Sequence, residues 1–151
     1  MATMLLAALR CAEAIDLKPG EVRLKDYEIK VVNGKGGKSR VVPIAATLEP
    51  YLYEWRRIRP NSPFFFSTLD GRRLHESYVR RMVKRYALKA GIEDDVHPHL
   101  LRHTCASAWA NEPPALALKE VQELLGHSRL STTEIYLHTN PDEMKRKLRM
   151  R

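Results

Sequence analysis

The sequence predicts an α+β fold that is mainly α-helical and contains a small three-stranded antiparallel sheet. Over most of the chain, apolar residues recur at the spacing of an amphipathic helix. Between Val22 and Ile44 they alternate with polar residues instead, which is typical of half-buried strands. The chain has 151 residues and no evident linker, so residues 1–151 are expected to form one domain with a core of its own.

The N-terminal part is predicted to form one helix followed by a hairpin. The helix ends at the Lys-Pro-Gly sequence of residues 18–20, and its apolar face comprises Leu5, Leu6, Leu9, Ala12 and Ile15. The two strands lie at residues 27–31 and 40–44, and the glycines of segment 33–39 permit the positive φ angles of a turn. Residues 63–67 are the candidate third strand.

Helix-terminating residues divide the rest of the chain into helices. They indicate a helix capped by Thr47 and ended by Pro60, one closed by Gly91, one opened by His97-Pro98, one ended by Gly126, a short one opened by Ser131 that carries Tyr136, and a last one opened by Pro141. The helix closed by Gly91 is expected to bury one apolar face, which comprises Val79, Met82, Val83, Tyr86, Ala87 and Ala90.

The chain is strongly basic, with 26 Lys and Arg against 18 Asp and Glu and a net charge of +8. Such a surplus favours a polyanionic partner, of which nucleic acid is the commonest, although solvated helix faces remain an alternative for any one cluster. The densest cluster comprises Arg80, Arg81, Lys84, Arg85 and Lys89. No apolar run is long enough to span a bilayer, so no membrane partner is expected. Cys11 and Cys105 are predicted to be free thiols in a cytoplasmic protein.

Four short motifs carry the functional information. His99-Leu100-Leu101-Arg102-His103 is followed by Leu125-Gly126-His127, with Tyr136 nine positions further on. Upstream, an R-x-x-E pattern begins at Arg10, and residues 34–43 read Gly-Lys-Gly-Gly-Lys-Ser-Arg-Val-Val-Pro. In this order and spacing the motifs resemble those of the tyrosine recombinases, the integrases of the lambda, Xer and Cre type. The resemblance covers nearly the whole chain and implies the catalytic fold of DNA breaking-rejoining enzymes.

Cleavage of a phosphodiester requires a nucleophile, charge stabilisation at phosphorus, a base and an acid. Arginine suits the second task because its planar guanidinium donates two parallel hydrogen bonds to phosphate oxygens. Arg10 and Arg102 could together hold both non-bridging oxygens. His99 lies three positions before Arg102, so a helix would point both side chains to one side.

The resemblance supplies a role for each site residue. The implied roles are nucleophile and carrier of a 3′-phosphotyrosyl linkage for Tyr136, phosphate clamp for Arg10 and Arg102, general base for His99, hydrogen-bond donor to the phosphate for His127, proton donor to the leaving 5′ oxygen for Lys35, and orienting carboxylate for Glu13.

Each assignment has a simpler alternative. Arg10 could be the surface ion-pair partner of Glu13 or Asp16. Lys35 could be a solvated lysine of a hairpin turn, and Tyr136 could be a half-buried core residue. The spacing of the tyrosine from the Leu-Gly-His motif favours the nucleophile.

No metal or cofactor is expected. His99 and His103 have the spacing of the H-E-x-x-H zinc motif, but Leu100 replaces its glutamate, and the sequence contains no P-loop. Arginine and lysine supply the positive charge that the reaction requires. The phosphotyrosyl bond conserves the energy of the broken linkage, so no nucleotide is required either.

The leading functional interpretation is site-specific DNA recombination by strand cleavage and rejoining. It implies double-stranded DNA as substrate, self-association as a tetramer on DNA, and a nucleoid-associated location in the cytoplasm. Type IB topoisomerase-like relaxation of DNA and a non-catalytic DNA-binding remnant of a mobile element are the alternatives. The resemblance also implies that residues 1–151 are the catalytic domain, without the N-terminal DNA-clamping domain and lead-in helices of family members.

The two ends of the chain raise further points. Near the N-terminus, Ala7-Ala8 stands where the family usually has Thr-Gly before its first arginine, which is a mild departure from the family motif. The segment after Tyr136 is expected, by resemblance, to dock onto a neighbouring subunit, and its basic residues could instead contact DNA. In either case removal of residues 141–151 is expected to leave the fold intact.

Overall fold

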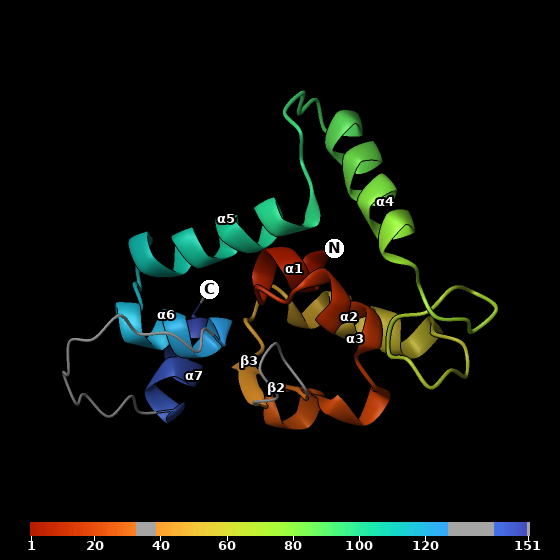
Figure 1. Cartoon of the computed structure of the whole chain (residues 1–151). Coiled ribbons are helices and arrows are strands. Elements are labelled where there is room, and N and C mark those ends of the chain that lie inside the picture. Colours follow the sequence, from red (N-terminus) through yellow and green to blue (C-terminus); the bar gives the residue numbers. More distant parts are fainter. Residues whose placement is uncertain (33–38, 127–140, 151) are drawn as a thin grey trace.

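The computed structural model describes residues 1–32, 39–126 and 141–150. Its helices are α1 (Ala2–Leu6), α2 (Cys11–Asp16), α3 (Glu49–Ile58), α4 (Glu76–Lys89), α5 (Pro98–Asn111), α6 (Leu118–Leu125) and α7 (Pro141–Arg149), and its strands are β1 (Val22–Arg23), β2 (Glu28–Val31) and β3 (Arg40–Pro43) (Figure 1). Short 3₁₀ turns, Pro19–Glu21 and Leu24–Asp26, flank β1. No helix in these ranges is both long and apolar enough to cross a membrane.

The sheet is antiparallel with strand order β1-β2-β3, which confirms the predicted three-stranded sheet. Ile29 pairs with Val22 on one side and with Val42 on the other. The third strand is β1, however, and the expectation for residues 63–67 was wrong. There the backbone of Phe65 is satisfied by other partners: its N–H donates to the Leu17 carbonyl at 2.5 Å, and its carbonyl accepts from the Trp55 indole at 2.7 Å.

The predicted N-terminal helix is interrupted between α1 and α2. Ala8 has a φ of +48°, and Arg10 is extended, with φ −67° and ψ 153°. Ala8 and Leu9 are fully buried in the turn, so the apolar spacing continues across the break and conceals it from a sequence pattern. The interruption makes Arg10 the N-cap residue of α2.

The later helix boundaries agree better with the sequence. Gly91 and Gly126 follow α4 and α6 with φ angles of +74° and +64°, and the His97 imidazole accepts a hydrogen bond from the Leu100 N–H at the start of α5. The predicted cap Thr47 is not used. A turn at Ala45, whose carbonyl accepts the N–H of Leu48 at 3.0 Å, leads directly into α3.

Two apolar clusters form the core. The larger joins the sheet to α3, α5 and α6, with Ile29, Val42 and Trp109 among its members. The smaller holds α4 against α1 and α2 through Met4, Ile15, Val79, Val83, Ala87 and Val96. In Figure 1, α5 lies over α1, and α6 and α7 lie together beside the sheet.

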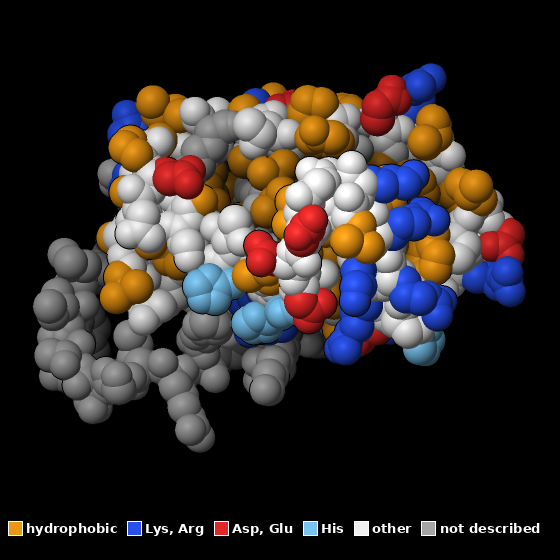
Figure 2. All heavy atoms as spheres, turned by 90° about the horizontal axis from the view of Figure 1, so that it is seen from above, with side chains coloured by type: hydrophobic (Ala, Val, Ile, Leu, Met, Phe, Trp, Pro, Cys, Tyr) orange, Lys and Arg blue, Asp and Glu red, His pale blue; other side chains and the backbone are white. Residues whose placement is uncertain are grey.

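The outward face of α4 is basic, as predicted. Figure 2 shows Lys and Arg side chains gathered on this part of the surface, and the exposed basic residues of the helix are Arg80, Arg81, Lys84, Arg85 and Lys89. The apolar face is narrower than expected, because Tyr86 and Ala90 are exposed.

Helix α7 packs on its own chain. Leu148 is fully buried in the larger core cluster. Lys145 and Lys147 pair with Glu28 at 3.0 Å and Glu120 at 3.3 Å. The guanidinium of Arg149 lies 4.0 Å from the ring centroid of Tyr27. The structure therefore disagrees with the expectation that residues 141–151 are dispensable for the fold, because their removal would uncover apolar core.

Candidate active site

Arg10 is held in place by the capping geometry of α2. Its backbone N–H donates to Oε2 of Glu13 at 2.7 Å, and its guanidinium donates to Oε1 of the same residue at 2.7 Å. The expected alternative of an ion pair with Glu13 is therefore correct as to the partner. It is wrong in placing the pair on the surface, because the Glu13 side chain is only 8% exposed. Asp16, the other candidate, pairs instead with Arg73.

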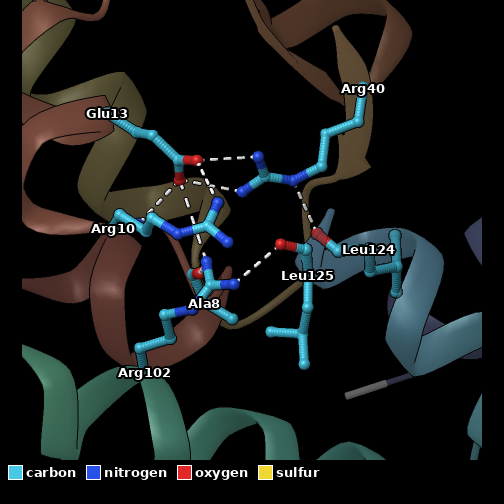
Figure 3. A network of polar contacts seen from close by, with 7 residues as sticks. All are labelled: Ala8, Arg10, Glu13, Arg40, Arg102, Leu124 and Leu125. Carbon is cyan, nitrogen blue, oxygen red and sulfur yellow. Dashed lines mark hydrogen bonds and ion pairs between the residues drawn. The ribbon is translucent and has the colours of Figure 1, made fainter. Parts of the chain in front are cut away.

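Arg102 enters the same place from α5. Its guanidinium donates to the Ala8 carbonyl and to the Leu125 carbonyl, the latter at 2.7 Å, and Nη1 lies 3.8 Å from Oε2 of Glu13 (Figure 3). The residue is 6% exposed. A buried guanidinium is tolerable only when its N–H groups are hydrogen-bonded, and these carbonyls provide the acceptors.

A third arginine, Arg40, completes the cluster. Its two terminal nitrogens donate to the two oxygens of Glu13, each at 2.8 Å, and Nε donates to the Leu124 carbonyl at 2.7 Å. Sequence reasoning included Arg40 only as part of the hairpin motif. One signal could have identified it: with a period of two it shares a strand face with fully buried Val42, so it is a basic residue on the inward side.

We call Glu13, Arg10, Arg40 and Arg102 the arginine cluster. Burial alone would raise the pKa of Glu13, but hydrogen bonds from Arg40 and Arg10 outweigh it and lower that pKa to about 2. Burial and the positive charge of Arg10 lower the pKa of Arg102 to about 10, which leaves it protonated at neutral pH. Three cations thus face one carboxylate among the described residues, and the unbalanced positive charge favours an anionic ligand.

The described histidines lie outside the arginine cluster. His99 is on α5, as predicted, but it is exposed whereas Arg102 is buried. The ring centroids of His97 and His99 are 6.3 Å apart. His103 is also exposed, with Nδ1 3.2 Å from the Ser107 hydroxyl.

Three of the six predicted site residues, Lys35, His127 and Tyr136, lie outside the described residues. Their flanking segments are described. The strand pair Val31 and Arg40 brackets the segment that contains Lys35. Gly126, the residue before His127, ends α6. The structure thus brings Arg10 and Arg102 together at Glu13 and places His99 on the helix that carries Arg102. The catalytic roles of all six residues stay predictions.

The position of Gly126 is constrained by the arginine cluster. A Cβ atom there would lie 3.1 Å from Cδ and 3.2 Å from Nη1 of Arg40, and the φ angle of +64° is one that favours glycine. The glycine therefore ends α6 and also leaves room for the Arg40 side chain.

Comparison with known proteins identifies the family. The profile of the Phage integrase family matches residues 1–143. A tyrosine recombinase of Pseudothermotoga lettingae is 33% identical over 143 residues, which are 95% of this chain and 49% of that protein. Tyrosine recombinase XerC of Haemophilus ducreyi is 36% identical over 143 residues, which cover 91% of this chain and 46% of the relative. The chain thus spans about half the length of the curated relatives it matches.

Solved structures agree with this assignment. XerA recombinase superposes with a TM-score of 0.76 at 30% identity, over 96% of this chain and 54% of the other. XerH recombinase bound to its difH substrate in a pre-cleavage complex gives a TM-score of 0.69 at 29% identity, over 85% of this chain and 38% of that one. These likenesses confirm the predicted recombinase catalytic fold. The chain belongs to the phage integrase family of tyrosine recombinases.

Proposed function

We propose that this chain is the catalytic part of a site-specific recombinase that cleaves and rejoins double-stranded DNA. The observation that carries the proposal is the convergence of Arg10 and Arg102 on Glu13. These are the two arginines that the family motifs assign to the phosphate. A carboxylate that fixes two guanidiniums, in a cluster with surplus positive charge, is suited to hold a phosphodiester with its non-bridging oxygens hydrogen-bonded.

The proposed reaction exchanges one phosphodiester for another. Tyr136 attacks phosphorus while His99 accepts the phenolic proton, because a phenol with a pKa near 10 is a poor nucleophile at neutral pH. The 5′ oxygen leaves with a proton from Lys35, and the DNA 3′ end remains joined to the tyrosine. A 5′ hydroxyl then reverses these steps and rejoins the strand. Arg10, Arg102 and His127 hold the phosphate throughout.

The outward face of α4 is the proposed contact surface for the DNA backbone. Within the described residues, Arg80 alone of its five exposed basic residues has a carboxylate within ion-pair distance, Glu76 at 3.7 Å. Arg57 and Arg72, by contrast, pair with Glu54 and Asp70 at 3.0 and 2.5 Å. A shallow hollow of 480 Å³ is lined by Arg81, Lys84, Arg85, Leu88 and Lys89. Cations without local counter-ions attract phosphates most strongly.

The proposal extends to the assembled state. Exchange between two duplexes breaks strands on both, and each copy supplies one nucleophile. We therefore include in the proposal a tetramer on DNA, acting at the nucleoid in the cytoplasm. The relatives support DNA as the substrate class, since XerH was solved with its difH substrate.

Covalent capture tests the proposal. The chain is incubated with a random-sequence library of nicked duplexes that lose the short 5′ product, and adducts are separated on a denaturing gel and sequenced. The wild type is expected to form an adduct, and tryptic mapping is expected to place the nucleotide on the Tyr136 peptide. Tyr136→Phe removes one oxygen and should abolish capture while DNA binding persists.

Tyr51→Phe is the matched control, because Tyr51 is an exposed tyrosine of α3 that is 62% accessible to solvent. It should capture DNA as the wild type does. An adduct that persists in Tyr136→Phe would refute the nucleophile, and the absence of any wild-type adduct would refute the proposed activity of this chain. Relaxation of supercoiled plasmid without strand exchange would favour the topoisomerase-like alternative.

A further inference from the structure

Arg40 connects three segments of the candidate site that are distant in sequence. It is the first residue of β3 and lies five positions after Lys35. Through its terminal nitrogens it holds both oxygens of Glu13, the carboxylate that also binds Arg10. Through Nε it holds the Leu124 carbonyl at the end of α6, three residues before His127.

The end of α6 is fixed by two arginines together. Arg40 binds the carbonyl of Leu124, and Arg102 binds the carbonyl of Leu125. The last carbonyls of a helix lack partners within the helix and carry partial negative charge, so cationic donors suit them well. Because both guanidiniums also lie at Glu13, a displacement of α6 would be transmitted to the carboxylate and from there to Arg10.

The Arg40 side chain is largely buried, and its guanidinium is engaged in hydrogen bonds. Its side chain is only 9% exposed, and the three nitrogens of its guanidinium each donate a hydrogen bond of 2.7 or 2.8 Å. The space beside its aliphatic stem is kept open by the missing side chain of Gly126. A lysine has a single terminal nitrogen and cannot reproduce a fork that binds two oxygens and a carbonyl at once.

We propose that Arg40 is a positioning residue of the reaction, which sets the relative placement of the Arg10 and Arg102 guanidiniums and of the C-terminal end of α6 through Glu13 and the Leu124 carbonyl. The inference rests on the proposed function. Arg40 acts through Glu13 and the α6 terminus, and the phosphate itself is held by the other two arginines. Loss of the Arg40 fork removes two of the hydrogen bonds that hold the Glu13 carboxylate, so β3 no longer fixes the orientation in which that carboxylate binds Arg10 and faces Arg102.

The test compares Arg40→Gln and Arg40→Lys with the control Arg23→Gln, which removes an arginine of the same sheet. Arg23 is 42% exposed and binds one residue, Glu28, at 2.7 Å among the described residues. Single-turnover capture is measured at saturating concentrations of a duplex recovered from the library selection. Both Arg40 variants are expected to lose about 100-fold in rate, the order of effect of a misplacement of about 1 Å. DNA affinity should change by less than about threefold, since phosphate contacts on the surface supply most of it.

Two further readouts separate positioning from loss of structure. Carboxyl NMR should show that the pKa of Glu13 rises in Arg40→Gln and stays in place in Arg23→Gln, because Arg40 supplies the strongest hydrogen bonds to it. The double variant Glu13→Gln/Arg40→Gln should be no slower than the slower single variant, as expected when two residues act as one unit. Urea unfolding checks the fold, and Arg40→Lys, which retains the buried charge, carries the test if Arg40→Gln does not fold.

The outcomes are distinguishable. If wild-type protein captures DNA and Arg40→Lys does so at a rate within about twofold of it, the positioning role is wrong while the proposed function stands. An unchanged pKa of Glu13, or additive losses in the double variant, would also refute it. If the wild type forms no adduct, the proposed function fails, and this inference fails with it.

Discussion

The protein uses arginine in two contrasting ways, in the arginine cluster and on the outward face of α4. In the cluster, three arginines share one carboxylate, and Arg40 and Arg102 are nearly inaccessible to solvent. On α4, five basic side chains are exposed, and among the described residues only Arg80 has a carboxylate close by. Buried guanidiniums must be hydrogen-bonded and therefore have fixed geometry, whereas exposed ones are solvated and adaptable.

Because of this contrast, the geometry of the arginine cluster and the affinity of the α4 face for DNA should respond to different conditions. The arginine cluster is screened little by salt but depends on the ionisation of Glu13, whose pKa is about 2. The α4 face lies in solvent, so salt should weaken its attraction for a polyanion, and acid should affect it little. Acid and salt are thus the two variables that test the regions independently.

Glu13→Gln should have the largest effect on stability. It leaves buried arginines without the charge that offsets their desolvation, and breaking such a buried pair costs about 3–5 kcal/mol. The measurement is the free energy of unfolding in urea at neutral pH. Glu54→Gln is the control, because Glu54 is 61% exposed and pairs with Arg57 on the surface of α3. It should lose less than about 1 kcal/mol.

The pH dependence sharpens this prediction. The native pKa of Glu13 is about 2 and its ordinary value is 4.5, so its contribution is fully present above pH 4.5 and declines as the pH falls toward 2. That difference in pKa corresponds to roughly 3 kcal/mol. The stabilities of the wild type and Glu13→Gln should therefore converge in acid. A gap that stays constant from neutral pH to pH 3 would show that the ionised carboxylate is not what stabilises the cluster.

Much of the fold was predictable because its signals are local. The β2–β3 hairpin follows from alternation around a glycine-rich segment, and α4 and α6 follow from apolar periodicity ended by Gly91 and Gly126. The break before Arg10 was not predictable in this way, since its buried residues preserve helical spacing. The third strand was misplaced because Phe65 satisfies its backbone through Leu17 and Trp55, partners that no local pattern reveals.

In the candidate site, too, some residues could be identified from the sequence and one could not, because its contacts are distant in sequence. The family resemblance singled out Arg10 and Arg102 and implied that Glu13 orients them, and the structure brings the three together. It did not single out Arg40, whose partners lie 27 and 84 positions away in sequence. Periodicity along β3 indicates that Arg40 faces inward, but it does not identify partners at such separation, because these depend on how β3 packs against α2 and α6.

Charge removal on α4 should produce a smaller effect, on affinity and not on stability. In Arg81→Gln/Lys84→Gln/Arg85→Gln, the slope of log K against log salt for a random-sequence duplex should become shallower by about one for each lost phosphate contact. Urea stability should be unchanged, because none of the three contributes to the core. The matched control replaces Arg57 and Arg72, which are paired with Glu54 and Asp70. If the control lowers the slope as much, α4 is not the DNA surface.

The smallest expected effect concerns the turn beneath the arginine cluster, where Ala7 and Ala8 are both fully buried but differ in backbone conformation. Ala7 has a φ of −132°, whereas Ala8, whose carbonyl binds Arg102, has a φ of +48°. Replacement of either by glycine removes one buried methyl group, about 0.8 kcal/mol, and adds about 0.5–1 kcal/mol of backbone entropy to the unfolded chain. Only at Ala8 does glycine also relieve the left-handed conformation, which costs an alanine roughly 1–2 kcal/mol.

Ala7→Gly should therefore lose roughly 1.5 kcal/mol of stability, whereas Ala8→Gly should stay within about 0.5 kcal/mol of the wild type because its gains and losses nearly cancel. The comparison is made by urea unfolding of the two variants under one set of conditions. Equal losses at both positions would mean that the turn at Ala8 carries no conformational cost. In that case the alanine at a position where the family usually has glycine would need no explanation from strain.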